Sequence, residues 1–174
     1  MTSFVYRRGI LFLFCLILIF VSCGCSFVSK GTTSDSSEIV SDITEKTSVP
    51  EKIVNEIKQK CNLPEMEELS LYQLGEIYGI KEKDVAYFSA LKASDSLVRD
   101  EIIVVQAMDE GEACSVRDRL QEYYENVLEE SKEYLPDEYE KVKNCTVVKD
   151  GVYVRLFISD NTEVMEKIYE SYNK

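Results

Sequence analysis

Residues 101–108, with the sequence Glu-Ile-Ile-Val-Val-Gln-Ala-Met, decide the fold of this chain. The β-branched run Ile102–Val105 is typical of a central strand that is covered on both faces. A second strand candidate, Val85–Leu91, precedes it, and the polar stretch Ser94–Arg99 provides the connection. The middle of the chain therefore predicts two strands of one sheet.

A long amphipathic helix is predicted directly after this strand. Asp109, with Glu112 three residues further on, has the spacing of a helix N-cap and its partner at N3. Apolar residues then recur at intervals of three and four, which is the pattern of a helix with one buried face: Ala113, Val116, Leu120, Tyr123, Val127 and Leu128. We expect Pro136 to end this helix, and a polar segment to follow from Asp137 to Asn144.

A hairpin and a last helix complete the C-terminal part. The apolar runs Cys145–Val148 and Val152–Ile158 are separated by Lys149-Asp150-Gly151, and Asp-Gly between apolar runs favours a tight hairpin. Asp160 and Glu163 then predict the start of a helix, on which Val164, Ile168 and Tyr172 share one face.

Two shorter helices are predicted before the first strand. Ser48 is a plausible N-cap, with Pro50 in the first turn and Glu51 at N3, for a helix that ends near Cys61. A second helix is indicated within 63–80, and the glycine at position 79 suits its C-terminal stop.

The element order α, α, β, β, α, β, β, α predicts an α+β fold: a two-layer domain over residues 48–174, with helices mainly on one face of a four-stranded sheet. The sheet is expected to be antiparallel or mixed, since the long helix also allows a crossover between parallel neighbours. The strand order stays open.

The N-terminal region predicts export and lipid anchoring. Arg7 and Arg8 precede the apolar run Ile10–Val21, which has the length of a signal-peptide core. The following Cys23 resembles the cysteine of a bacterial lipobox, so residues 1–22 are predicted to be a signal peptide and Cys23 to carry the lipid. Cys25 is the alternative attachment point. An uncleaved membrane anchor is the other interpretation, because residues 9–29 carry no charge and are long enough to span a bilayer.

Residues 23–47 are predicted to be a lipidated cysteine followed by a flexible tether, since Ser and Thr fill 10 of the 22 positions from Ser26 to Thr47. The chain is acidic, with 20 Lys and Arg against 32 Asp and Glu. This charge argues against nucleic-acid binding. Histidine is absent, which removes the commonest general base and the imidazole ligands of zinc. We expect no cofactor, no metal site and no recognisable catalytic residue.

Cys61, Cys114 and Cys145 remain for the globular domain, an odd number without C-x-x-C spacing. Either they are free thiols or two of them form a single disulfide. Tyr124 and Tyr139 are the candidates for a surface that contacts a glycan or peptide, whereas the helical spacing favours the core for Tyr123.

A set of residues along the domain resembles the bacterial lipoprotein family called domain of unknown function 4358. They are Leu74, Tyr78-Gly79-Ile80, Asp84-Val85, Asp100-Glu101-Ile102, Val104-Val105, Tyr134-Leu135-Pro136, Val142, Val147-Val148, Gly151, Tyr153-Val154 and Ile158-Ser159-Asp160. The resemblance covers about Val49 to Ile168. It implies an exported lipoprotein of a Gram-positive anaerobe, and it brings no catalytic residues with it.

Together these features predict a lipid-anchored protein at the outer face of the bacterial cell membrane. Its expected role is that of a non-enzymatic binding module, held at the membrane by its N-terminal lipid and contacting an envelope protein or glycan. One alternative is a small envelope hydrolase that works through paired carboxylates, which requires buried acids facing each other in one cleft. The other is an accessory solute-capture lipoprotein.

Overall fold

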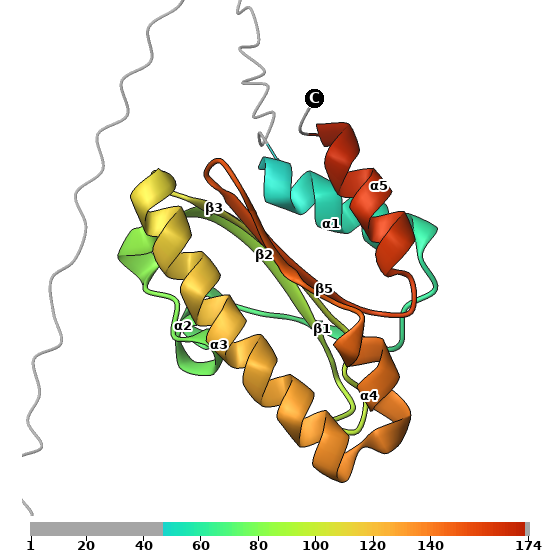
Figure 1. Ribbon diagram of the computed structural model, residues 1–174. Coiled ribbons are helices and arrows are strands. Elements are labelled where there is room, and N and C mark those ends of the chain that lie inside the picture. Colours follow the sequence, from blue (N-terminus) through green and yellow to red (C-terminus); the bar gives the residue numbers. More distant parts are fainter. Residues whose placement is uncertain (1–46, 173–174) are drawn as a thin grey trace, which may run out of the picture. The chain divides into compact units, whose positions relative to one another are not determined.

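The computed structural model describes residues 47–172. Its elements are helices and the strands of one sheet (Figure 1). In chain order they are α1 (Val49–Lys60), β1 (Met66–Glu68), α2 (Leu71–Tyr78), the 3-10 turn η1 (Glu82–Asp84), β2 (Val85–Ala93), β3 (Glu101–Ala107), α3 (Glu110–Tyr134), α4 (Pro136–Lys143), β4 (Val147–Asp150), β5 (Tyr153–Ile158) and α5 (Thr162–Tyr172). The predicted signal peptide, Cys23, Cys25 and the tether up to residue 46 lie outside the described residues.

The five strands form one sheet in the order β1-β2-β3-β5-β4, and every neighbouring pair is antiparallel. The predicted central strand is confirmed, because β3 lies between β2 and β5 and is buried continuously from Glu101 to Val105. The predicted α+β class is confirmed as well. The sheet has five strands instead of the predicted four, and the antiparallel alternative holds.

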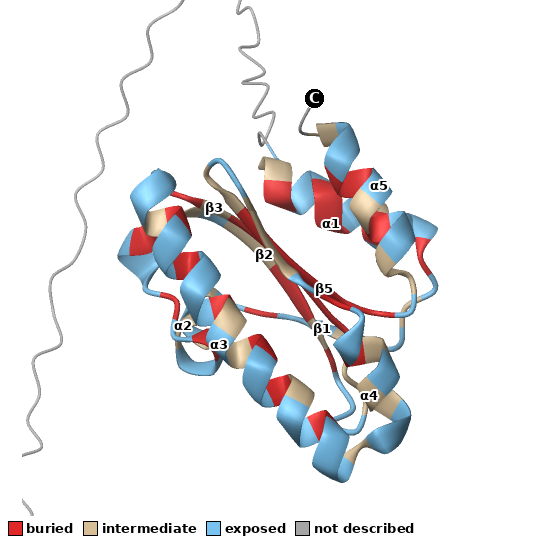
Figure 2. Cartoon of the chain, in the orientation of Figure 1, coloured by how far each residue is buried: buried red, intermediate tan, exposed pale blue. Residues whose placement is uncertain are grey.

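Helices cover both faces of the sheet, whereas the sequence predicted them mainly on one face. The helices α2, α3 and α4 lie on one face, and α1 and α5 lie side by side on the other (Figure 1). Figure 2 shows buried residues on the sides of the helices that meet the sheet. The sequence pattern missed this because α1 and α5 come from opposite ends of the domain and pair only in three dimensions.

Each face therefore has its own hydrophobic core. The larger core joins the sheet to α2, α3 and α4 through residues that include Leu74, Ile103, Val105, Leu120 and Val127. The smaller core joins the other face to α1 and α5 through Ile53, Val54, Ile57, Leu91, Ile102, Val104, Phe157, Met165, Ile168 and Tyr169. On α5 the buried face is thus Met165, Ile168 and Tyr169, while Val164 of the predicted face is exposed.

The predicted helix boundaries follow from local hydrogen bonds. Ser48 and Glu51 form a reciprocal capping box at the start of α1. At α3 the Asp109 carboxylate accepts from the Glu112 N–H at 2.9 Å. Gly79 has φ of +68° at the end of α2, a left-handed conformation that favours glycine.

The hairpin is confirmed with a small shift. Asp150 pairs with Tyr153, so the turn is formed by Gly151 and Val152, and Gly151 has φ of +57°. The helix α5 begins at Thr162, and its first turn bonds back to the carbonyl of Asn161 instead of being capped by Asp160.

Three elements were not predicted: β1, α4 and the 3-10 turn η1. β1 is a three-residue strand held by backbone pairing of Met66–Glu68 with Leu91–Ala93. α4 occupies the segment predicted to be merely polar, and it buries Val142. Pro136 does end α3, but it also occupies the first turn of α4, where its missing N–H costs nothing.

The three domain cysteines are all free, which decides against the disulfide alternative. Cys61 and Cys145 are buried and Cys114 is exposed. Between residues 47 and 172, no helix combines the length and apolar character needed to cross a membrane.

Candidate functional site

The structure buries one of the two predicted contact tyrosines, Tyr124, and leaves Tyr139 partly exposed. Tyr124 is 8% exposed, and its hydroxyl donates to the Val142 carbonyl at 3.1 Å. Tyr139 is half-buried, with the Lys143 ammonium 5.6 Å from its ring centre. The expectation that Tyr124 lies on the surface is wrong. The helix α4 packs against α3, so α3 buries residues against α4 as well as against the sheet.

Tyr123 belongs to a buried polar group on β3 that we call the Glu101 cluster: Glu101, Lys92, Tyr78 and Tyr123. The Glu101 side chain is 1% exposed. Its carboxylate accepts from the Tyr123 hydroxyl at 2.5 Å and from the Tyr78 hydroxyl at 3.2 Å, and it forms an ion pair with Lys92. The two tyrosine rings meet edge to face, 4.5 Å between centres. The cluster thus joins α2, β2, β3 and α3.

The electrostatics of the Glu101 cluster favour a structural role over a catalytic one. Burial, and then the nearby Glu101 carboxylate, raise the pKa of both the Tyr78 and the Tyr123 phenol well above the ordinary range. Both hydroxyls therefore remain protonated and donate to the carboxylate. The Lys92 ammonium pairs with the same carboxylate, so all four side chains are bonded within the cluster.

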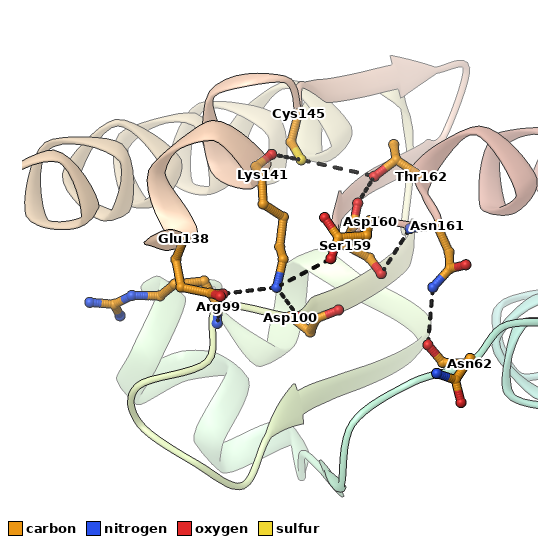
Figure 3. A network of polar contacts seen from close by, with 10 residues as sticks. All are labelled: Asn62, Arg99, Asp100, Glu138, Lys141, Cys145, Ser159, Asp160, Asn161 and Thr162. Atoms are coloured by element: carbon orange, nitrogen blue, oxygen red, sulfur yellow. Dashed lines mark hydrogen bonds and ion pairs between the residues drawn. The ribbon is translucent and has the colours of Figure 1, made fainter. Parts of the chain in front are cut away.

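A second polar group, the Lys141 network, ties α4 to the connection between β2 and β3 (Figure 3). The Lys141 ammonium lies 2.7 Å from Asp100 Oδ2 and 2.8 Å from Glu138 Oε2. The same Glu138 oxygen accepts from the Arg99 backbone N–H at 2.9 Å. Asp160, just before α5, lies 3.9 Å from the ammonium. Figure 3 shows the Lys141 side chain pointing between these carboxylates.

Charge pairing outweighs burial in this network. Burial acts to lower the pKa of Lys141, but its bonds to Asp100 and Glu138 override that effect and raise it. Burial likewise acts to raise the pKa of Glu138, and the bonds from Lys141 and the Arg99 N–H lower it instead. An ammonium held protonated between two carboxylates is neither a nucleophile nor a general base.

A hollow of about 480 Å³ adjoins the Lys141 network, between the end of α4 and the start of α5. The Cys145 thiol is close by, with Sγ 3.1 Å from the Lys141 carbonyl and 4.0 Å from Thr162 Oγ1. Burial raises the pKa of this thiol, so it stays in the unreactive protonated form at neutral pH.

The hydrolase alternative requires buried acids that face each other in one cleft, and each buried acid of the described residues has a lysine beside it. Asp84, Asp100 and Glu101 are the buried acids between residues 47 and 172, and each contacts a lysine: Lys83, Lys141 and Lys92, respectively. Asp100 and Glu101 belong to different clusters. Among the described residues, two carboxylates approach each other at two places, and at each place they share an ammonium. Asp100 and Glu138 share that of Lys141. Asp84 and Glu112, which line a hollow of about 390 Å³, share that of Lys83 at 2.7 and 3.6 Å. Nor do the described residues bring together three side chains that could hold a metal ion.

A larger hollow, about 620 Å³, lies where β2 runs past the first turns of α1. We call it the β2 groove. One wall is formed by Ser48, Glu51 and Asn55 of the α1 region, the floor by residues 87–90 of β2, and one end by Glu68 and Leu69; Thr47 also borders it. The lining contains two carboxylates and no lysine or arginine.

The floor of the β2 groove is an open strand edge. β1 pairs with β2 only at Leu91–Ala93, and the Leu69 N–H then bonds the Ala90 carbonyl at 2.9 Å. Within residues 47–172, positions 85–89 of β2 have β3 on one side and no strand on the other. Tyr87, on this edge, is 56% exposed. The sequence does not reveal this site, because β1, whose short length leaves the edge of β2 open, has no strand pattern of its own.

Residues 59–159 match the protein family described as Domain of unknown function (DUF4358). The match covers more than half of the chain. The chain belongs to this family. The matched part of this DUF4358 protein contains the whole sheet with α2, α3 and α4, whereas α5 and nearly all of α1 lie outside it. No curated protein and no solved structure matched the chain. The family description assigns no activity.

Proposed function

We propose that this protein is a lipid-anchored binding module at the outer face of the bacterial cell membrane, and that it acts by holding a partner rather than by catalysis. The observation that carries the binding role is the β2 groove, a hollow beside an unpaired strand edge. Such edges are recurrent sites for recognising extended segments, and folded proteins otherwise protect them.

The membrane part of the proposal rests on the N-terminal sequence. Arg7 and Arg8, the apolar run Ile10–Val21 and the small residue before Cys23 match the order of a secretory signal with a lipid-attachment cysteine. The Ser- and Thr-rich residues 26–47 then provide a tether of low apolar content. A tethered module samples partners on the same membrane at a high effective concentration.

The non-catalytic part rests on the state of the buried polar groups. In the Glu101 cluster and the Lys141 network, carboxylates are bound by ammonium or phenol groups that remain protonated. A general acid or base needs a pKa near the working pH and a free path to the substrate. The raised pKa values of Tyr78, Tyr123 and Lys141 move these groups away from that range, and their bonds to carboxylates support a role in fixing the elements around them.

The anchor is tested by intact-mass analysis of the membrane-extracted protein beside Cys23→Ala and Cys25→Ala variants. We expect a mature mass that begins at Cys23 and includes a diacylglyceryl group, lost in Cys23→Ala and kept in Cys25→Ala. Loss in Cys25→Ala alone would move the attachment to the alternative cysteine. A mass that retains Met1 would show an uncleaved anchor, and an unlipidated mature chain would refute the anchoring proposal.

A further inference from the structure

We propose that residues 39–44 of this chain, from the segment that precedes α1, add to the open edge of β2 as an antiparallel strand and cover the β2 groove. The inference deepens the binding role proposed above, because it names what a partner has to displace, but the pairing itself needs no partner. Three features carry it: the backbone of the edge, the place where the preceding segment joins the domain, and the sequence of the segment.

The backbone of β2 offers hydrogen bonds along its open edge. Within a strand, successive residues direct their N–H and C=O groups to alternate sides. The Ala93 N–H bonds the Asp100 carbonyl on the β3 side, and the Ala90 carbonyl accepts from Leu69 on the opposite side. Phe88, two residues before Ala90, therefore directs its backbone N–H and C=O toward the open edge. A strand laid there forms main-chain bonds without any rearrangement of the sheet.

The preceding segment joins the domain beside the groove. Thr47 and Ser48, which lead into α1, both border the hollow. Lys58, near the other end of α1, bonds to Glu68 at 2.7 Å, and Glu68 pairs with Leu91 in the later part of β2. The helix therefore begins beside the early part of β2 and runs toward its later part. A segment that runs antiparallel to β2 along the open edge ends close to the start of this helix.

An added strand of this direction continues the row that β1 begins. β1 is antiparallel to β2, and its chain leaves the edge after the Leu69 N–H bonds the Ala90 carbonyl. The edge that remains open is residues 85–89, a length that residues 39–44 cover in extended form. Residues 45–47 then span up to about 10 Å to the start of α1. The added strand also keeps the antiparallel order of the sheet.

Residues 39–44, Ile-Val-Ser-Asp-Ile-Thr, have the composition of a strand within a Ser- and Thr-rich segment. Ile, Val and Thr are β-branched and favour extended backbone. In a strand, Ile39 and Ile43 lie on the same face. We place that face over Phe88, which is half-buried in the floor of the groove. The segment thus brings apolar side chains to a strand edge that is otherwise open to water.

Covalent connection selects this occupant, and charge does not. The two acids that line the groove already have partners: Glu68 has the Lys58 ammonium and Glu51 has the Ser48 backbone N–H, each at 2.7 Å. A free peptide or a second copy must reach the edge from solution. A segment joined to Ser48 is instead present at an effective concentration on the order of 1 mM. Even weak strand pairing is therefore populated within one chain.

The test is amide hydrogen exchange of the full chain, purified from membranes in detergent micelles. The double variant Val40→Pro, Ser41→Pro removes two adjacent backbone N–H groups, one of which faces β2 in either register. The matched control Thr32→Pro, Thr33→Pro makes the same change earlier in the segment. All four positions precede the folded residues 47–172, so the domain should fold in both variants.

We expect the Phe88 amide to exchange about tenfold more slowly in the wild type than in the Val40→Pro, Ser41→Pro variant, since a segment docked for about nine-tenths of the time lowers the open fraction about tenfold. The control variant should match the wild type. The Ser89 amide, which faces β3, should exchange slowly in all three proteins and shows that the sheet is intact. Protection within one chain should not change with protein concentration.

Three results would overturn the inference. Equal exchange of the Phe88 amide in the wild type and the Val40→Pro, Ser41→Pro variant would show that the segment does not cover the edge. An equal loss of protection in the control would show that residues 39–44 are not the part that pairs. Protection that rises with protein concentration would assign the edge to a second copy. Retention of envelope proteins by the variant with the freed groove tests the binding role separately, and its absence would count against that role alone.

Discussion

Replacing Lys141 with methionine should destabilise the domain strongly, because two carboxylates share its ammonium. The Lys141 side chain is 10% exposed, Asp100 is 7% exposed and Glu138 is 19% exposed. Lys141→Met leaves both carboxylates nearly enclosed without their cation. Removing one partner of a buried ion pair costs about 3–5 kcal/mol, and the partial exposure of Glu138 favours the lower end. This loss is a large fraction of the free energy of unfolding of a typical domain, about 5–15 kcal/mol.

The loss should depend on pH in a direction that the pKa shifts determine. The pKa of Glu138 is lowered in the folded state. Glu138 therefore stabilises the fold when the pH is above the ordinary glutamate pKa, and this contribution is lost as the pH falls through the lowered pKa. The pKa of Lys141 is raised in the folded state. Lys141 therefore stabilises the fold when the pH is below the ordinary lysine pKa, and this contribution is lost as the pH rises through the raised pKa. The difference between wild type and Lys141→Met should therefore be largest near neutral pH and shrink at about pH 3.

Urea unfolding, followed by circular dichroism at both pH values, measures this difference. The control is Lys143→Met on the same helix, where the side chain is half exposed and pairs with Glu140; its effect should stay below about 1 kcal/mol. If Lys141→Met is too unstable to measure, the triple variant with Asp100→Asn and Glu138→Gln should recover stability, since the unpaired charges are gone. A loss below about 1 kcal/mol at neutral pH, or one that does not shrink in acid, would refute the assignment of the network as a buried joint.

Two further predictions concern the Glu101 cluster and the thiols. Tyr123→Phe removes one donor from the buried Glu101 carboxylate and should lower the free energy of unfolding in urea by about 1.5–3 kcal/mol. The control Tyr134→Phe, on a side chain that is 74% exposed, should change it by less than about 0.5 kcal/mol. Equal effects of the two variants would contradict the role of the Glu101 cluster in stability. In the native protein, maleimide should label exposed Cys114 quickly and the two buried domain thiols only after denaturation, because burial also raises their pKa. Peptide-resolved mass spectrometry checks this, and rapid native labelling of Cys145 would contradict its burial.

The parts of the fold that depend on local patterns could be predicted from the sequence. The run Ile102–Val105 and the Asp-Gly turn at residues 150–151 each contain their own signal, and Asp109 caps α3 through a bond to a residue three positions away. β1 carries no such signal, because Met-Glu-Glu has no strand periodicity and exists as a strand only through backbone pairing with Leu91–Ala93.

The candidate site could not be predicted because it depends on which segments become neighbours. The β2 groove requires that β1 stop at Glu68 while β2 continues, and that the first turn of α1 lie above the gap. The Lys141 network joins residues 41 positions apart in the sequence. For Tyr124, the helical pattern of α3 was correct, but the packing of α4 against α3 decided its burial.

The separation of the two cores has a consequence for the order in which the domain folds. The larger core draws on residues 69–158, one continuous stretch. The smaller core instead needs α1 and α5 together, and the Tyr172 hydroxyl bonds to Glu56 across 116 positions. During synthesis, the apolar stripe of α1 emerges first and must wait for the last helix, so the earliest segment of the domain is the last to be enclosed. Ile53, Val54 and Ile57 are therefore fully enclosed only after the C-terminal helix has been made.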